Sequence, residues 1–90
     1  MAQVKIVIPT PLRQYAGNRD AVDIEAGMVR DALANLVERY EQLRRHLFSD
    51  DGRLRNFVNV YVNEEDIRYL MQEGTPLKGG DTISIVPSIA

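Results

Sequence analysis

The chain has 90 residues and a formal net charge of −2; 44% of its residues are hydrophobic and 27% are charged. This length holds one hydrophobic core, so we expect a single domain over residues 1–90. The slightly acidic balance argues against nucleic acid as a partner, and no apolar run approaches the roughly 20 residues that span a bilayer, so no membrane partner is expected. The sequence has no cysteine. This excludes disulfides, thiolate metal ligands and Cys nucleophiles among these residues and agrees with a cytoplasmic location.

Two strands are expected at the start of the chain. Residues 4–8 alternate in polarity, so one face of the strand is apolar and the other, which carries Val7, is mixed. Pro9 ends this strand because it cannot donate a backbone N–H. Residues 19–24 predict a second strand, antiparallel to the first, in which Ala21, Val22 and Ile24 compete for the inner face.

Residues 27–40 predict the main helix. Apolar side chains recur there at spacings of three and four and form one stripe: Val29, Leu33, Leu36, Val37 and Tyr40. A further helical turn is expected over residues 42–47, where two leucines lie four positions apart.

The second half of the chain predicts three more strands. Residues 55–63 alternate between three inward valines and an outward set that includes Phe57 and Tyr61. A turn over residues 63–66 leads to a short strand at 67–70. A tight turn at residues 79–81 then opens the last strand, which places two isoleucines inward and Val86 outward.

This order of elements predicts an α+β fold. A single helix buries its apolar stripe against one face of a sheet. A right-handed crossover carries the third strand to the far side of the first, and the last strand then fits between them, parallel to the first. The prediction is a β-grasp (ubiquitin-like) fold with a mixed four- to five-stranded sheet packed on one main helix.

Four outward side chains are expected to meet on the open face of this sheet: Val7, Phe57, Tyr61 and Val86. Exposed apolar patches often mark partner sites, although cross-strand contacts alone also favour exposed aromatic residues. The position beside the C-terminal tail favours a partner-docking surface.

Catalytic motifs are lacking in this sequence. His46 is the single histidine and has no recognisable triad, and no serine sits in a nucleophile motif. The acidic run at 64–66 lacks the ligand spacing of a calcium loop and is better explained as a solvated turn. We therefore expect a protein carrier or substrate, not an enzyme, with no bound cofactor and no metal.

Several motifs, taken together and in order, resemble the ubiquitin-like sulfur-carrier family. They are IPTPLR at 8–13, AGMVRDALANLVERY at 26–40, FVNVYVN at 57–63, EDIR at 65–68, TPLKGGD at 75–81 and SIVPSIA at 84–90. The family includes the small subunit of molybdopterin synthase and the sulfur carriers of the thiamine and cysteine pathways. The opening and the FVNVYVN segment are most similar to the cysteine-pathway carrier.

The resemblance implies a mechanism. An activating enzyme of the ubiquitin-activating type would use ATP to adenylate the C-terminal carboxylate, and a sulfur donor would convert it to a thiocarboxylate. An acceptor synthase would then take the sulfur, for cysteine first and molybdopterin next. Under this reading, Pro87, Ser88, Ile89 and Ala90 form the tail (residues 87–90) that enters the partner's active site.

The family pattern ends in Gly-Gly, which would directly follow Ala90. We expect an intact chain to continue with these glycines, so that the reactive group lies beyond the residues printed here. Two alternatives remain: a ubiquitin-like modifier joined through its C-terminus to lysines of other proteins, or a non-catalytic interaction module if the natural chain ends at Ala90.

Overall fold

The computed structural model describes residues 2–87. Its strands and helices follow in the order β1 (Ala2–Val7), β2 (Ala21–Ala26), α1 (Val29–Arg39), α2 (Arg44–Leu47), β3 (Val58–Val62), β4 (Glu65–Asp66) and β5 (Thr82–Pro87). Four short 3-10 helices lie between them: η1 (Thr10–Tyr15), η2 (Glu41–Leu43), η3 (Ile67–Tyr69) and η4 (Gln72–Gly74).

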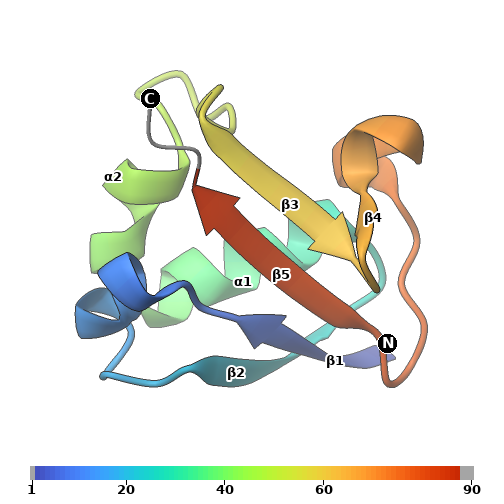
Figure 1. Cartoon of the computed structure of the whole chain (residues 1–90), viewed down its shortest axis with the longest axis horizontal. Helices are drawn as coiled ribbons and strands as arrows, with labels where there is room; N and C mark the ends of the chain where they lie inside the picture. The colour runs from blue at the N-terminus through green and yellow to red at the C-terminus, as the bar shows by residue number, and fades with distance from the viewer. Residues whose placement is uncertain (1, 88–90) are drawn as a thin grey trace.

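The five strands form one mixed sheet in the order β2-β1-β5-β3-β4. β5 runs parallel to β1 on one side and antiparallel to β3 on the other. In Figure 1, α1 crosses behind the sheet and the opposite face of the sheet is uncovered. This confirms the β-grasp prediction, including the place of the last strand.

The core lies between the sheet and α1. The predicted helical stripe is buried, with Val29, Leu33, Leu36 and Val37 at most 2% exposed. One row of inward side chains crosses the sheet and meets this stripe, since Val22 pairs with Ile6, Ile6 with Ile83, and Ile83 with Val62. Burying this apolar surface is the main favourable term that holds helix and sheet together.

Helix α1 ends where its backbone leaves the helical region. Tyr40 has φ −127° and ψ 82°, and its N–H still donates to the Leu36 carbonyl. The chain then continues as η2 and α2, which bury Leu43 and Leu47 against the core. The predicted turn over residues 42–47 is therefore present, and the break from the first helix falls at Tyr40.

The prediction of a short strand at residues 67–70 is wrong. Asn63 and Glu64 both have positive φ, 50° and 76°, which is the backbone of a tight two-residue hairpin turn. Val62 therefore pairs with Glu65, and β4 occupies residues that were expected to be a turn. The Asp66 side chain then accepts the Arg68 N–H and starts η3 in place of a strand.

The third strand begins three residues later than predicted, at Val58. The preceding residues are tied to α2 instead of to the sheet, because the Arg55 N–H donates to the Leu47 carbonyl and the Val58 N–H to the Arg55 carbonyl. Phe57 thus lies in a turn just before β3 and not within it.

The second strand is also displaced, to residues 21–26. Its inner positions are Val22, Ile24 and Ala26, all at most 3% exposed, whereas Ala21 faces outward. The register with β1 decides this question, since Val7 pairs with Ala21 and both residues share the outer face.

Two substitutions in β5 test the assignment of its faces. Ile83→Ala removes a side chain that is fully buried, so we expect a loss of about 2–5 kcal/mol in the free energy of unfolding. Val86→Ala lies on the outer face of the same strand and should change that free energy by about 0.5 kcal/mol or less. Chemical denaturation of both variants gives the comparison, and equal losses would contradict the assignment.

Candidate functional site

The described chain leaves the sheet at the C-terminal end of β5. Pro87, the last described residue, pairs with Val58 at the start of β3 and is partly buried. The other residues of the predicted tail, Ser88, Ile89 and Ala90, lie outside the described residues. We call the end of the sheet where β5 finishes the exit end.

One row of outward side chains crosses the middle of the open face. The register places Ala21 beside Val7, Val7 beside Ser84, Ser84 beside Tyr61, and Tyr61 beside Asp66. The first four are uncharged and half-buried. Two of the four predicted docking residues, Val7 and Tyr61, therefore share this row with Ser84 between them.

The other two predicted docking residues lie closer to the exit end. Val86 is 44% exposed and pairs with Asn59, which also faces outward. Phe57 is 48% exposed in the turn that leads into β3. We use the name docking surface for Val7, Phe57, Tyr61 and Val86, all of which are at least partly exposed. Their part in partner binding stays a prediction.

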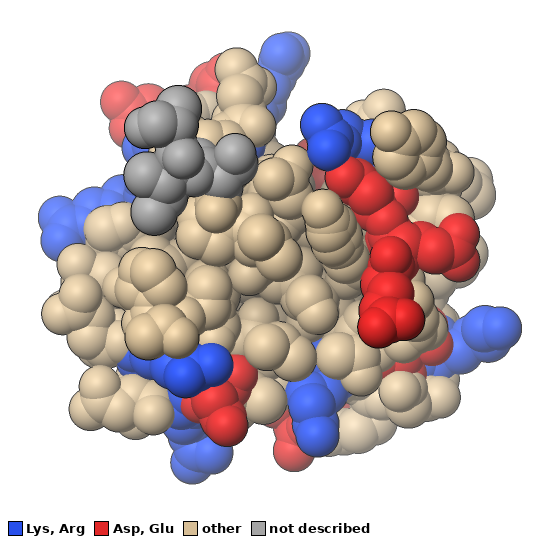
Figure 2. Space-filling view, viewed as in Figure 1, with Lys and Arg blue, Asp and Glu red and all other residues tan. Residues whose placement is uncertain are grey.

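Charged side chains occupy the other end of the same face. Lys5 pairs with Asp23 on one side and Thr82 on the other, one step further from the exit end. In Figure 2 the centre of this face carries no charged side chain, and acidic residues gather at the side where β4 lies. The uncharged part of this face therefore lies between the charged row and Pro87, the last described residue.

Register also shows which residues the sequence analysis left out of the site. Ala21 is one of three residues that compete for the inner face in the sequence, and Ser84 and Asn59 have no expected role in the site. Alternation along β5 and β3 is the sequence signal for the last two. For Ala21 the signal is alternation along β2, where Val22, Ile24 and Ala26 are buried, and the pairing with Val7 agrees with it.

A buried carboxylate fixes the start of β5. Asp81 is 9% exposed, and each of its oxygens accepts one hydrogen bond. Asn63 Nδ2 donates to Asp81 Oδ1 at 2.8 Å, and the Lys78 backbone N–H donates to Asp81 Oδ2 at 2.8 Å. Asn63 Oδ1 in turn accepts the Thr82 N–H at 3.0 Å. The turn before β5, the hairpin after β3 and the first residue of β5 are thus linked.

These contacts lower the pKa of Asp81. The Lys78 N–H is the largest cause and the Asn63 amide the next, while burial works in the opposite direction. The Gly80 φ of +90° allows the turn that brings the Lys78 N–H to the carboxylate. The ionised form of Asp81 is therefore the form that stabilises the folded chain.

The outer edge of β2 is covered by side chains of α1. Asn35 Nδ2 donates to the Glu25 carbonyl at 3.0 Å, and an Arg39 guanidinium nitrogen donates to the Asp23 carbonyl at 3.2 Å. These bonds occupy acceptors that an added strand would need. The open face of the sheet is therefore the better candidate for binding than this edge.

The acidic run at 64–66 is held in part by an arginine. Arg68 contacts both oxygens of Asp66, at 2.7 Å for the shortest pair, and this interaction lowers the pKa of the Asp66 carboxyl. Among residues 2–87, no three histidine or acidic side chains are placed to hold a metal ion.

His46 is held against another aromatic ring. It is half-buried and stacks on Tyr15, with ring centroids 4.3 Å apart and an interplanar angle of 25°. Its Nε2 atom is buried without a hydrogen-bond partner among the described residues. No acid or nucleophile faces that atom through a hydrogen bond, so His46 supplies packing in this structure and not a catalytic dyad.

A hollow of about 860 Å³ lies between α1, α2 and the loop that follows α2. Its arginines, Arg30, Arg44, Arg45 and Arg53, are all exposed. A small-molecule site usually combines an apolar pocket with a few buried polar groups, and this hollow has no such centre among the described residues.

This chain matches a known protein family over most of its length. The model of the ThiS family matches residues 6–90. The chain belongs to the ThiS family. The match begins at Ile6, near the end of β1, and continues to residue 90, so it includes all four residues of the docking surface.

Two relatives named as sulfur carriers align with this chain over almost their whole length. The sulfur carrier protein CysO of Mycobacterium tuberculosis is 33% identical over 89 residues, which are 97% of this chain and 96% of the relative. A putative sulfur carrier protein of Archaeoglobus fulgidus is 29% identical over 87 residues, with the same two coverages.

Solved structures agree in fold. CysO in the BexX/CysO complex of Amycolatopsis orientalis superposes with a TM-score of 0.88 at 32% identity, covering 97% of each chain. The small archaeal modifier protein 1 of Methanosarcina acetivorans gives a TM-score of 0.88 at 29% identity, covering all of this chain and 96% of that one. The resemblance noted from the sequence is therefore confirmed, and so is the fold class.

A membrane-spanning helix is not found within residues 2–87, where the helices are too short and too polar to cross a bilayer.

Asp81→Asn tests the hydrogen bonds that the Asp81 carboxylate accepts from Asn63 and Lys78, which we call the Asp81 clamp. An amide has one acceptor oxygen, so one of the two donors that now face the carboxylate would face an NH₂ group instead. We expect a loss of about 1–3 kcal/mol in the free energy of unfolding near neutral pH. Thermal and urea unfolding measure it.

The same pair of proteins has a defined pH dependence. Because the folded-state pKa of Asp81 is lowered, its contribution is complete above the unfolded-state pKa and is lost as the pH falls through the folded-state pKa. The stability difference between wild type and Asp81→Asn should therefore shrink on acidification. A difference that stays constant to strongly acidic pH would contradict the role of the ionised carboxylate.

Proposed function

We propose that this chain is a sulfur-carrier protein whose C-terminus is adenylated and then converted to a thiocarboxylate for sulfur transfer in biosynthesis. The observation that carries the proposal is the ThiS family match over residues 6–90. On this proposal the protein is a substrate of other enzymes and not a catalyst, in keeping with the relatives named sulfur carrier proteins.

The chemistry takes place on the terminal carboxylate. A carboxylate oxygen attacks the α-phosphorus of ATP, pyrophosphate leaves, and the carboxyl carbon becomes electrophilic as an acyl-adenylate. Hydrosulfide from a sulfur donor then adds to that carbon, AMP and a proton leave, and the thiocarboxylate remains. ATP is used by the activating enzyme and is not a bound cofactor of the carrier.

The fold fixes the point from which the C-terminal tail leaves the sheet. β5 is held between two strands and by the Asp81 clamp, so the tail leaves from a rigid point. The uncharged part of the open face borders that point, and an enzyme that binds the docking surface would receive the tail in a restricted range of positions. Holding reactants in this way removes part of the entropic barrier of their reaction.

Two kinds of partner enzyme follow from this role: an activating enzyme of the ubiquitin-activating type and an acceptor synthase. The relatives named CysO support cysteine biosynthesis as the first pathway to test. A structural neighbour described as a putative molybdopterin converting factor subunit, at 26% identity and a TM-score of 0.77, supports molybdopterin as the second. We place the carrier in the cytoplasm, where ATP is available.

A sulfur-loading assay tests the proposal. The chain extended by Gly-Gly after Ala90 is incubated with candidate activating enzymes, ATP and a sulfur donor, and its intact mass is measured. We expect a mass gain that corresponds to one sulfur-for-oxygen exchange at the C-terminus. Reactions without ATP are the control, and no gain with any cognate activating enzyme would refute the carrier role.

Val86→Asp tests the docking surface. A charge at this half-exposed position should leave the fold intact and weaken binding to the partner enzyme by about tenfold or more, because the partner must desolvate it. Met71→Asp, at a side chain that is 68% exposed in the turn between η3 and η4, is the matched control and should bind as wild type does. Calorimetric titration measures binding. Equal affinity for the two variants would reject this surface.

The alternative function is that of a ubiquitin-like protein modifier. The structural match to small archaeal modifier protein 1 supports this alternative. Branched peptides that carry the tail of this chain, found in digests of cell protein, would support the modifier role. A third alternative, an interaction module without terminal chemistry, requires that the chain ending at Ala90 keep full function in the cell.

A further inference from the structure

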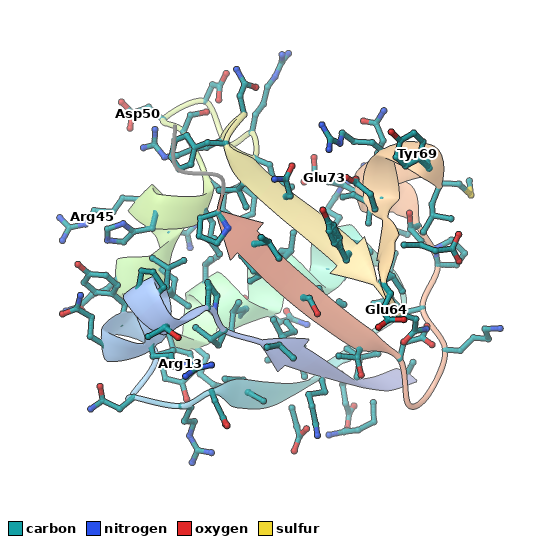
Figure 3. The ribbon with its side chains drawn as sticks, viewed as in Figure 1. Arg13, Arg45, Asp50, Glu64, Tyr69 and Glu73 are labelled. Carbon is teal, nitrogen blue, oxygen red and sulfur yellow. The ribbon has the colours of Figure 1, made fainter. Side chains whose placement is uncertain are left out.

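A second exposed tyrosine lies beside the docking surface. Tyr69, the last residue of η3, is 85% exposed, more than any other large hydrophobic side chain in the described chain. Tyr69 and Tyr61, which belongs to the docking surface, line one hollow of about 620 Å³ along β4 and η3. Figure 3 shows Glu64 at the beginning of this segment and Tyr69 at its far end. The hollow therefore adjoins the docking surface and shares Tyr61 with it.

The lining of this hollow is mostly acidic. Besides the two tyrosines it contains Glu64, Glu65, Asp66 and Arg68, so three negative side chains and one positive side chain give a net charge of −2. Asp66 and Arg68 form an ion pair of 2.7 Å with one another. Glu64 and Glu65 are exposed, and their side chains make no hydrogen bond or ion pair with residues 2–87. Acidic residues are visible along this side of the open face in Figure 2.

The chain itself places one guanidinium among these groups. Arg68 donates from Nε and Nη2 to the Asp66 carboxylate, and this interaction raises the pKa of Arg68. Tyr69 and Tyr61 act on that pKa in the same direction, so both phenol groups lie near the guanidinium. The charge of Arg68 is balanced by Asp66, which leaves the charge of the two glutamates for a second cation.

Carboxylates and aromatic rings together recognise a planar cation. A guanidinium forms paired N–H···O bonds with carboxylates, stacks on aromatic faces and is more weakly hydrated than an ammonium group. Tyrosine and arginine are also prominent among the residues that carry most of the binding energy in protein interfaces. The group that fits this hollow is therefore the side chain of an arginine.

We propose that the hollow extends the docking surface and takes an arginine side chain of the partner enzyme. The inference rests on the proposed function and adds a chemical feature of the partner, which is a guanidinium beside the apolar patch that covers Tyr61 and Val86. Complementary charge at one side of an otherwise uncharged interface fixes the orientation in which two proteins meet and raises their rate of association. The carrier then presents its exit end to the partner in one orientation.

Titration with a small arginine derivative tests the hollow without any enzyme. The isotope-labelled chain is titrated with N-acetylarginine amide, and backbone amide shifts are followed by NMR. The control ligand is N-acetylcitrulline amide, which has nearly the same shape and no charge. We expect weak, saturable shifts centred on residues 61 and 64–69, about fivefold larger than those from the citrulline derivative and smaller at high salt.

Tyr69→Leu tests the exposed ring. Met71→Leu is the matched control, because Met71 is 68% exposed, lies two residues further along the chain and does not line this hollow. We expect Tyr69→Leu to weaken binding of N-acetylarginine amide by about threefold or more, since the cation loses an aromatic face. Met71→Leu should bind as wild type does. Circular dichroism confirms that both variants are folded.

The double variant Glu64→Gln, Glu65→Gln tests the charge. Its control is Glu38→Gln, Glu41→Gln, which removes two negative charges from exposed positions outside the hollow. The first should weaken binding by about threefold or more and reduce its dependence on salt, and the second should change neither. Arginine-derivative shifts spread evenly over all acidic parts of the surface would overturn the inference, as would equal weakening by the hollow variants and their controls.

The same variants extend the test to the partner. An activating enzyme that loads the chain with sulfur should bind the Glu64→Gln, Glu65→Gln variant about tenfold more weakly than wild type and associate with it more slowly. The Glu38→Gln, Glu41→Gln control should match wild type. A chain that binds the arginine derivative and is not loaded refutes the carrier role alone. A chain that is loaded and does not bind the derivative in this hollow refutes the inference alone.

Discussion

The insertion of β5 between β1 and β3 is the constraint on which the rest of the molecule depends. Without it, the β1–β2 pair and the β3–β4 hairpin would share no hydrogen bonds. β5 joins them by pairing in parallel with one and antiparallel with the other, and its inward Ile83 completes the row that covers α1. Such non-local pairing has to overcome the entropy of closing a long loop, so it needs strong local support.

That support is concentrated at the beginning of the strand. The Asp81 carboxylate holds the turn and the neighbouring hairpin, and the Asp81 carbonyl accepts from Lys5 in β1. One residue thus contacts both halves of the sheet. A strand that is fixed at its start and paired along its length delivers its end to a definite place, which is the property a carrier of a reactive terminus requires.

The two ends of β5 differ in character. The start is surrounded by polar contacts and both lysines, whereas the finish borders the uncharged part of the open face and segments whose basic residues are arginines. The parallel pairing of β1 with β5 and the antiparallel pairing of β3 with β5 produce this separation, because together they bring the loop that follows β1 and the segment that precedes β3 to the same end. The proposed docking and chemistry therefore belong to one end of β5, and the contacts that support the strand lie at the other.

Much of the fold could be predicted from residue patterns. The apolar stripe from Val29 to Val37 and the alternation in β3 and β5 predict which sides of these elements are buried. This works because side chains repeat about every 3.6 residues around a helix and every second residue along a strand. The site could be predicted less well. The outward direction of Val86 and Tyr61 could be predicted from alternation. The neighbours of Val7 could not, because they depend on how β1 is aligned with β2 and β5.

The sequence by itself determined the fold class, the inner faces and the family, since periodicity, turn residues and ordered motifs are local or linear properties. Only the tertiary structure decided that Ser84 lies between Val7 and Tyr61 and that Asp81 is a buried carboxylate with two hydrogen-bond donors. Both depend on partners distant in sequence, β1 and β3 for Ser84 and Asn63 for Asp81, whereas η3 follows from the turn at Asn63 and Glu64 and the Asp66 cap just before it. The grouping of uncharged surface and arginines at one end has the same origin, because strand order brings together segments that are far apart along the chain.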